Sequence, residues 1–143
     1  LNHKYILGDY TAMEIQDNYI RHIYAIEEIK DGDTLVAVAE LGYDVLGRIT
    51  FRFKGINTAE KNSAKGTKRY VLAQQAKEHV NKVMKNHRVR VHSEKFEKGG
   101  FGRYLGSMYY EKDGKWIDLN QEMLDMGLAQ VYYKGASKDF GEF

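Results

Sequence analysis

Three short segments near the start of the chain have the patterns of β-strands: apolar and polar residues alternate weakly in the first and clearly in the third, and the second is apolar throughout. The turn Lys30-Asp31-Gly32-Asp33 separates the first two segments, and Gly42 and Gly47 bracket a predicted hairpin before the third. In the third segment the alternation places Arg52 on the face opposite its apolar neighbours. The predicted strands cover residues 19–29, 35–39 and 49–54.

A helix is predicted next, after a basic stretch over residues 61–69 that has no apolar period and indicates an exposed loop. Apolar residues then recur at intervals of three and four from Val71 to Met84, and Asn86 supplies a plausible end. An alternating strand follows over residues 88–92 and another strand over residues 104–110, and Asp113-Gly114 marks a hairpin turn.

A second helix is predicted over residues 119–126, because Asp118 and Gln121 form a capping-box pattern and Gly127 stands at the C-terminal cap position. The resulting order is three strands, a helix, two strands and a second helix. This order predicts an α+β fold: a five-stranded barrel of the oligonucleotide-binding (OB) type with two to three α-helices. Such barrels commonly receive nucleic acids on their open face.

The size of the chain, 143 residues, predicts a single domain over residues 1–143. Residues 1–18 form an N-terminal extension in this prediction and residues 134–143 a tail, and whether the tail folds as a third helix stays open. No apolar stretch of about 18 or more residues is present, so we expect a soluble domain with no membrane partner. No oligomer signal is visible in the sequence, so we expect a monomer. The chain opens at Leu1 without a signal segment, so secretion after removal of such a segment stays open.

Charge is distributed unevenly along the chain, although the formal net charge is only +2. Residues 48–103 contain 15 Lys and Arg against four Asp and Glu, a balance of +11, whereas the rest has seven against 16, a balance of −9. A polarised protein of this kind can steer a polyanion such as nucleic acid toward its basic part. The alternative is that helices carry basic residues on their solvated faces for solubility alone.

Four short stretches, far apart in sequence, together carry the groups that phosphodiester hydrolysis needs. Asp31-Gly32-Asp33-Thr34 and Asn57-Thr58-Ala59-Glu60 supply oxygens that can hold a hard cation and a carboxylate that can handle a water molecule. Phe51-Arg52 and Phe101-Gly102-Arg103 supply guanidinium groups that can bind two phosphate oxygens at once. Each stretch alone is more common as a turn or a surface segment, so the prediction depends on the whole set.

The same stretches resemble those of the staphylococcal nuclease family, the thermonuclease-like domains, in the family's order and with similar spacing. The resemblance covers roughly residues 21–133. It implies an OB-fold enzyme, a calcium-dependent nuclease that hydrolyses single- or double-stranded DNA and RNA and leaves 3′-phosphates.

The resemblance also implies roles for individual residues by position. Asp33 would bind Ca²⁺ through its carboxylate and Thr58 through its backbone carbonyl. Glu60 would position or deprotonate the attacking water, and Arg52 and Arg103 would bind the phosphate. These three form the expected catalytic set.

The chain departs from the family pattern in the loop that contains Asn57 and Ala59, where aspartate and proline are usual. Asn57 keeps a carbonyl oxygen that can bind calcium, but the site loses one negative charge, so we expect weaker calcium binding. The alternative is a nuclease-like domain that binds nucleic acid without cutting it. Phe101 stands where the family has a tyrosine and can still stack on a base.

Further contacts to substrate are predicted outside the catalytic set. Lys65, Lys68 and Arg69 are candidates for gripping the nucleic-acid backbone, with simple solubility as the alternative. Among the tyrosines, Tyr132 or Tyr133 is the candidate for stacking on a base by the family's pattern, and Tyr133 is the residue that we assign.

Overall fold

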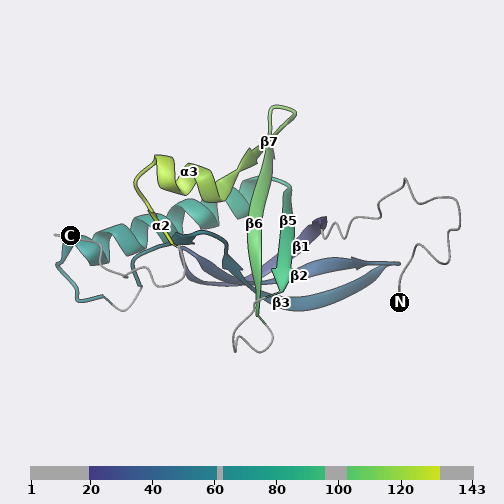
Figure 1. Ribbon diagram of the computed structural model, residues 1–143, viewed down its shortest axis with the longest axis horizontal. Helices are drawn as coiled ribbons and strands as arrows, with labels where there is room; N and C mark the ends of the chain where they lie inside the picture. Colours follow the sequence, from purple (N-terminus) through teal and green to yellow (C-terminus); the bar gives the residue numbers. More distant parts are fainter. Residues whose placement is uncertain (1–19, 61–62, 96–102, 133–143) are drawn as a thin grey trace, which may run out of the picture.

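The computed structural model describes residues 20–60, 63–95 and 103–132, and Figure 1 shows the arrangement of its elements. Most of the predicted elements are present, with longer strands than the alternation alone predicted. In chain order the elements are β1 (Ile20–Asp31), β2 (Thr34–Gly42), β3 (Val45–Phe53), β4 (Ile56–Asn57), α2 (Lys68–Asn86), β5 (Val89–Lys95), β6 (Arg103–Lys112), β7 (Lys115–Asp118), α3 (Leu119–Asp125) and β8 (Gln130–Val131).

Five of these strands close into a barrel. The strands are hydrogen-bonded in the order β3, β2, β1, β5 and β6, and β6 pairs back onto β3 to complete the circle. This last pairing is parallel and joins residues 50–53 to residues 103–106, whereas the other pairings around the barrel are antiparallel. We call the parallel pairing the β3–β6 seam. The five-stranded α+β barrel of the OB type is therefore confirmed.

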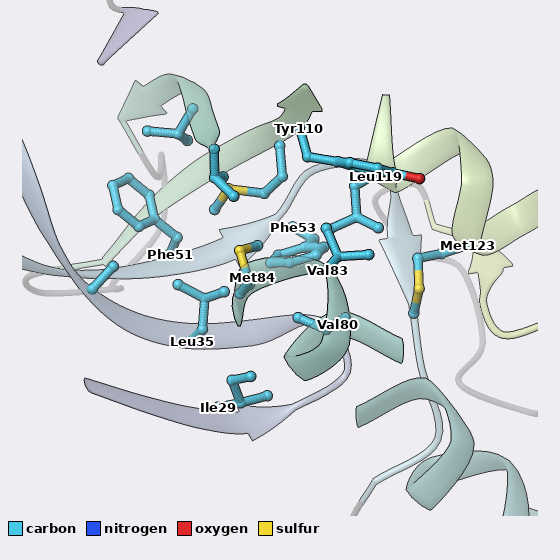
Figure 2. Close-up of a cluster of buried hydrophobic side chains, with 14 of the residues drawn as sticks. Ile29, Leu35, Phe51, Phe53, Val80, Val83, Met84, Tyr110, Leu119 and Met123 are labelled. Carbon is cyan, nitrogen blue, oxygen red and sulfur yellow. The ribbon is translucent and has the colours of Figure 1, made fainter. Parts of the chain in front are cut away.

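The core is filled by alternate residues of the strands and by one face of each helix. Phe51 and Phe53 of β3 are each 1% exposed, and Val80 of α2 and Met123 of α3 are completely buried against the same cluster. Figure 2 shows these side chains converging from the strands and the helices. Because every second residue of β3 points inward, Arg52 must point outward, as the alternation predicted.

In the hairpin between β2 and β3 the strands are longer than predicted and the turn is shorter. Its turn is Tyr43-Asp44, where φ is +53° and +62°, and two successive positive φ values match the twist of a two-residue hairpin. Gly47 lies inside β3 and not in the turn, and a Cβ there would stand 2.6 Å from Cδ1 of Leu41. The prediction that Gly42 and Gly47 bracket the turn was therefore too wide, because close packing requires the second glycine.

The basic stretch over residues 61–69 is only partly a loop. The hydroxyl of Thr67 accepts a hydrogen bond of 3.1 Å from the Tyr70 backbone N–H and caps α2, which begins at Lys68. Lys68 and Arg69 therefore lie on the first helical turn, and the predicted start of the helix at Val71 was three residues late. Residues 61–62 are outside the described part of the chain.

The hairpin at Asp113-Gly114 is confirmed and leads into β7, which the alternation did not predict. α3 then starts as predicted, because the Asp118 carboxylate accepts from the Gln121 N–H at 3.0 Å. α3 ends in a Schellman motif. The Gly127 N–H donates to the Leu124 carbonyl, and the Leu128 N–H donates to the Met123 carbonyl. No helix within the described ranges is long and apolar enough to cross a bilayer.

Candidate active site

Asp33 ends the turn between β1 and β2 and is 8% exposed. One carboxylate oxygen, Oδ1, accepts from the Thr34 hydroxyl at 2.9 Å, and the other, Oδ2, accepts from the Thr58 backbone N–H at 2.9 Å. The Asp33 carbonyl accepts from the Phe53 N–H at 2.8 Å, which ties the turn to the end of β3. Asp33 thus joins the turn to the segment that contains Thr58, a pairing that sequence alone did not predict.

Arg52 lies on the outer face of β3, opposite Thr34 of β2 in the strand register. Its Nη1 donates to the carbonyls of Phe53 at 3.0 Å and Ile56 at 2.8 Å, and it lies 3.4 Å from Oδ2 of Asp33. Its Nη2 donates to Oδ1 of Asn57. Only 14% of the Arg52 side chain is exposed, and these contacts fix the position of its guanidinium at the edge of the barrel.

Asn57 and Thr58 are 3% and 4% exposed, because Ile56–Asn57 pairs with Gln130–Val131 as a small second sheet. The sequence pattern predicted a loop here, since a two-residue strand leaves no period to detect. Among the described residues, the Thr58 hydroxyl is buried and finds no hydrogen-bond partner. We call Asp33, Arg52, Asn57 and Thr58 the candidate cluster.

Gly32 brings α2 against this cluster. A Cβ at Gly32 would lie 2.7 Å from Cβ of Ala76 in α2 and 3.0 Å from Cγ2 of Thr58. Any larger residue would therefore push α2 or the Thr58 segment away from the turn. The glycine between the two acidic residues of the turn is required by packing.

Glu60 is exposed and follows Ala59, which is 1% exposed. Its backbone carbonyl accepts from both the N–H and the hydroxyl of Ser63, at 3.1 Å and 2.7 Å. The chain therefore leaves the core at Glu60, two residues beyond Thr58. Glu60 is thus an exposed carboxylate two residues along the chain from the candidate cluster.

Arg103 opens β6 and is exposed. In the β3–β6 seam it pairs with Thr50, and Arg52 pairs with Leu105. Since residues two apart on a strand share a face, Arg52 and Arg103 lie on the same outer face with their Cα atoms about 8 Å apart. The barrel therefore brings together the two arginines that the sequence analysis assigned to the phosphate.

The predicted substrate-binding residues are placed less uniformly. Lys65 is exposed before α2, Lys68 is exposed as its first residue, and Arg69 is half-buried. Phe101 and Tyr133 lie outside the described residues.

Tyr132, the alternative to Tyr133 for stacking, is described and is 39% exposed. Its N–H donates to the Gly55 carbonyl at 2.8 Å, and its ring centroid lies 5.6 Å from Cζ of Arg52. The contact between Tyr132 and Arg52 was not predicted, because it depends on the pairing of β4 with β8.

Comparison with known families gave a match that covers the larger part of the chain. The family described as staphylococcal nuclease homologue matches residues 50–142, a range that includes Arg52, Asn57, Glu60 and Arg103 and begins after Asp33. A search of curated proteins gave no match. Since the match covers more than half of the chain and the barrel has the expected strand order, the chain belongs to the staphylococcal nuclease homologue family.

Proposed function

We propose that this protein is a calcium-dependent nuclease that hydrolyses the phosphodiester bonds of DNA and RNA and leaves 3′-phosphates. The observation that carries the proposal is the convergence of three separate segments: the Asp33 turn, the end of β3 with Arg52, and the Asn57-Thr58 segment hydrogen-bond to one another. Arg103 lies on the same outer face of the adjacent strand. We propose as well that residues 1–143 form one domain around this site.

The donors of the candidate cluster fit a hard cation in chemistry. Asp33 offers a carboxylate, Asn57 an amide oxygen, and Thr58 a backbone carbonyl beside a buried hydroxyl that has no partner among the described residues. Calcium accepts such mixed oxygen ligands in irregular geometry. Bound there, the ion would neutralise negative charge on the phosphate and lower the pKa of a nearby water.

The protein side chains would then carry out the hydrolysis. Glu60 orients a water and takes its proton as the water oxygen attacks phosphorus. Arg52 and Arg103 donate hydrogen bonds to the phosphate oxygens, on which negative charge builds as the bond forms. The bond from phosphorus to the 5′-oxygen breaks, so the 3′-side keeps the phosphate, and the 5′-oxygen takes a proton from solvent water and leaves as a hydroxyl.

A second candidate function is nucleic-acid binding without cleavage, and one feature favours it. The Oδ1 atom of Asn57 already accepts from Arg52, and Asp33 lies 3.4 Å from the same guanidinium. No three His, Asp or Glu side chains gather as a metal site in residues 20–60, 63–95 and 103–132. Calcium would therefore have to compete with Arg52 for these oxygens with little negative charge to favour it.

The deciding experiment measures cleavage of a labelled single-stranded DNA during a calcium titration, with a chelator blank. Glu60→Gln is compared with Glu78→Gln, a matched loss of one exposed carboxylate on α2. We expect calcium-dependent cutting that Glu60→Gln abolishes and Glu78→Gln retains. Intact DNA at saturating calcium, with the protein folded and bound to it, would establish the binding function instead.

A further inference from the structure

A second surface lies on the outer face of the barrel, away from the candidate cluster. It is formed by Arg90 of β5, Tyr109 of β6 and Trp116 of β7, and we call it the Arg90 surface. Arg90 pairs directly with Tyr109, and Trp116 pairs with Glu111, two residues along β6. In Figure 1, α2 and α3 lie to the left of β5 and β6.

The Arg90 guanidinium lies over an aromatic ring on this surface. Its neighbours Val89 and Val91 are buried in the core, so the Arg90 side chain points outward. Its Cζ lies 4.4 Å from the centroid of the Trp116 ring, which is within the range of a cation–π contact. Arg90 Nε is buried without a hydrogen-bond partner among the described residues.

The carboxylates around Arg90 already have other partners. Glu94 lies 2.6 Å from Nζ of Lys54, and Glu111 lies 3.9 Å from Arg88. Asp118, which pairs with Tyr109, accepts from the N–H of Gln121 as the cap of α3. Within the described chain the positive charge of Arg90 therefore meets an aromatic ring and has no carboxylate partner.

We propose that the Arg90 surface binds single-stranded nucleic acid beyond the candidate cluster, with Arg90 on a backbone phosphate and Tyr109 beside an unstacked base. A stacked guanidinium keeps its outer edge free for two phosphate oxygens, and aromatic rings stack on bases of any sequence. This inference rests on the proposed function in taking nucleic acid as the ligand. It does not require cleavage.

The strand register of the barrel shows that a single nucleic-acid strand can reach both the candidate cluster and the Arg90 surface. Leu105 of β6 pairs with Arg52, and Tyr109 of the same strand pairs with Arg90. Four residues of a β-strand span about 13 Å. A nucleic-acid strand that contacts both surfaces is thus consistent with the roughly 4–16 nucleotides that one OB fold binds.

The test compares Arg90→Ala with Arg48→Ala, since both remove one arginine from the barrel surface and Arg48 already pairs with Glu27. Binding of labelled single-stranded DNA of about 4 and about 16 nucleotides, the ends of that range, is followed by fluorescence anisotropy in chelator over a salt series. Thermal unfolding of each variant confirms that it is folded. Arg90→Lys keeps the charge but loses the flat stacked group.

For Arg90→Ala we expect about tenfold weaker binding of the longer DNA and a salt slope smaller by about 0.7, the value for one lost phosphate contact on a single strand. Arg48→Ala should change the binding of either DNA by less than about twofold, since exposed ion-paired arginines contribute little. Arg90→Lys should fall between wild type and Arg90→Ala. Equal behaviour of Arg90→Ala and Arg48→Ala on the longer DNA would overturn the proposal.

A duplex of the same length separates the single-strand part of the inference. We expect Arg90→Ala to weaken duplex binding less than single-strand binding, because paired bases cannot stack on Tyr109. An equal loss on both would contradict that part. Failure of the proposed nuclease would appear separately, as intact DNA with calcium while the effect of Arg90→Ala on binding persists.

Discussion

Two groups of buried and half-buried polar side chains connect the elements of this barrel. They differ in whether all of their polar atoms have hydrogen-bond partners within the described chain. The candidate cluster leaves the Thr58 hydroxyl without a partner in the described chain. The other group, which we call the helix anchor, consists of His79, Tyr110, Asn120 and Glu122. In it, Glu122 accepts from Tyr110 at 2.6 Å and lies 2.7 Å from Nε2 of His79, so each of its carboxylate oxygens has a partner.

Asn120 shows the same completeness within the helix anchor. Its Oδ1 accepts from the Met108 N–H at 3.1 Å, and its Nδ2 donates to the carbonyls of Lys54 at 2.9 Å and Gly106 at 3.1 Å. A polar network whose members all pair within the chain makes the packing rigid and specific. The candidate cluster has donors and acceptors to offer a ligand, so the comparison separates a structural network from one suited to binding.

The largest expected effect is a loss of activity from a substitution that changes the candidate site and leaves the helix anchor intact. Arg103→Ala should lower kcat/KM for DNA cleavage by about 10²–10³-fold, because one fewer donor stabilises the charge on phosphate. Arg48→Ala serves as the control, and thermal unfolding should be alike for both variants. A loss of activity no larger than that of the control would remove Arg103 from the catalytic set.

The second effect is a loss of stability from a substitution in the helix anchor. Asn120→Ala leaves one N–H and two carbonyls without their partner, and we expect the free energy of unfolding to fall by about 2–4 kcal/mol. Urea unfolding measures the change, with Asn81→Ala on the exposed face of α2 as the control. If both variants lose the same stability, the network is less important than its geometry indicates.

The third prediction sharpens the difference in charge between the two groups. Asn57→Asp adds a carboxylate beside Asp33, and we expect it to raise calcium affinity about tenfold, because calcium sites are tuned by the number of charged ligands. Isothermal titration calorimetry measures the affinity, and Asn86→Asp at the end of α2 controls for net charge. An unchanged affinity would place the ion elsewhere.

The smallest effect concerns pH. Burial, followed by the hydrogen bond to Glu122 and its negative charge, raises the pKa of Tyr110 from 10.0 to about 12. The unfolded chain loses this proton first, so the stabilisation is complete below pH 10.0 and is lost as pH rises through about 12.

Tyr110→Phe should cost about 1 kcal/mol at neutral pH and should reduce the loss of stability between pH 10 and 12. Urea unfolding at several pH values measures both, with Tyr24→Phe as the control because Tyr24 is 73% exposed. A steep alkaline loss that is identical in wild type and Tyr110→Phe would assign it to another group.

The fold was predictable because its strands and helices carry their own periodicity. Alternation in β3 and β5 and capping at Asp118 are local signals, and each led to an element that the structure contains. The two-residue strands β4 and β8 carry no such signal. They are defined by the pairing of Asn57 with Gln130, two residues that lie far apart along the chain.

The candidate site was predictable as a list of residues, and its internal contacts were not. Asp33, Arg52, Asn57 and Thr58 could be named from sequence, but the bond from Arg52 to Asn57 depends on the bend of the chain after β3. The pairing of His79 with Glu122 joins two helices and leaves no trace in local sequence. Contacts of this kind follow from tertiary packing, which residue patterns do not encode one by one.

The β3–β6 seam has a consequence for when the candidate site is assembled. Arg52 and Arg103 are far apart along the chain and become neighbours only through this pairing, which Asn120 fastens by donating to a carbonyl on each side. Contacts between distant segments form late, because a long loop must close first. We therefore expect Arg52 and Arg103 to become neighbours only when β6 pairs with β3, and to separate wherever that pairing opens.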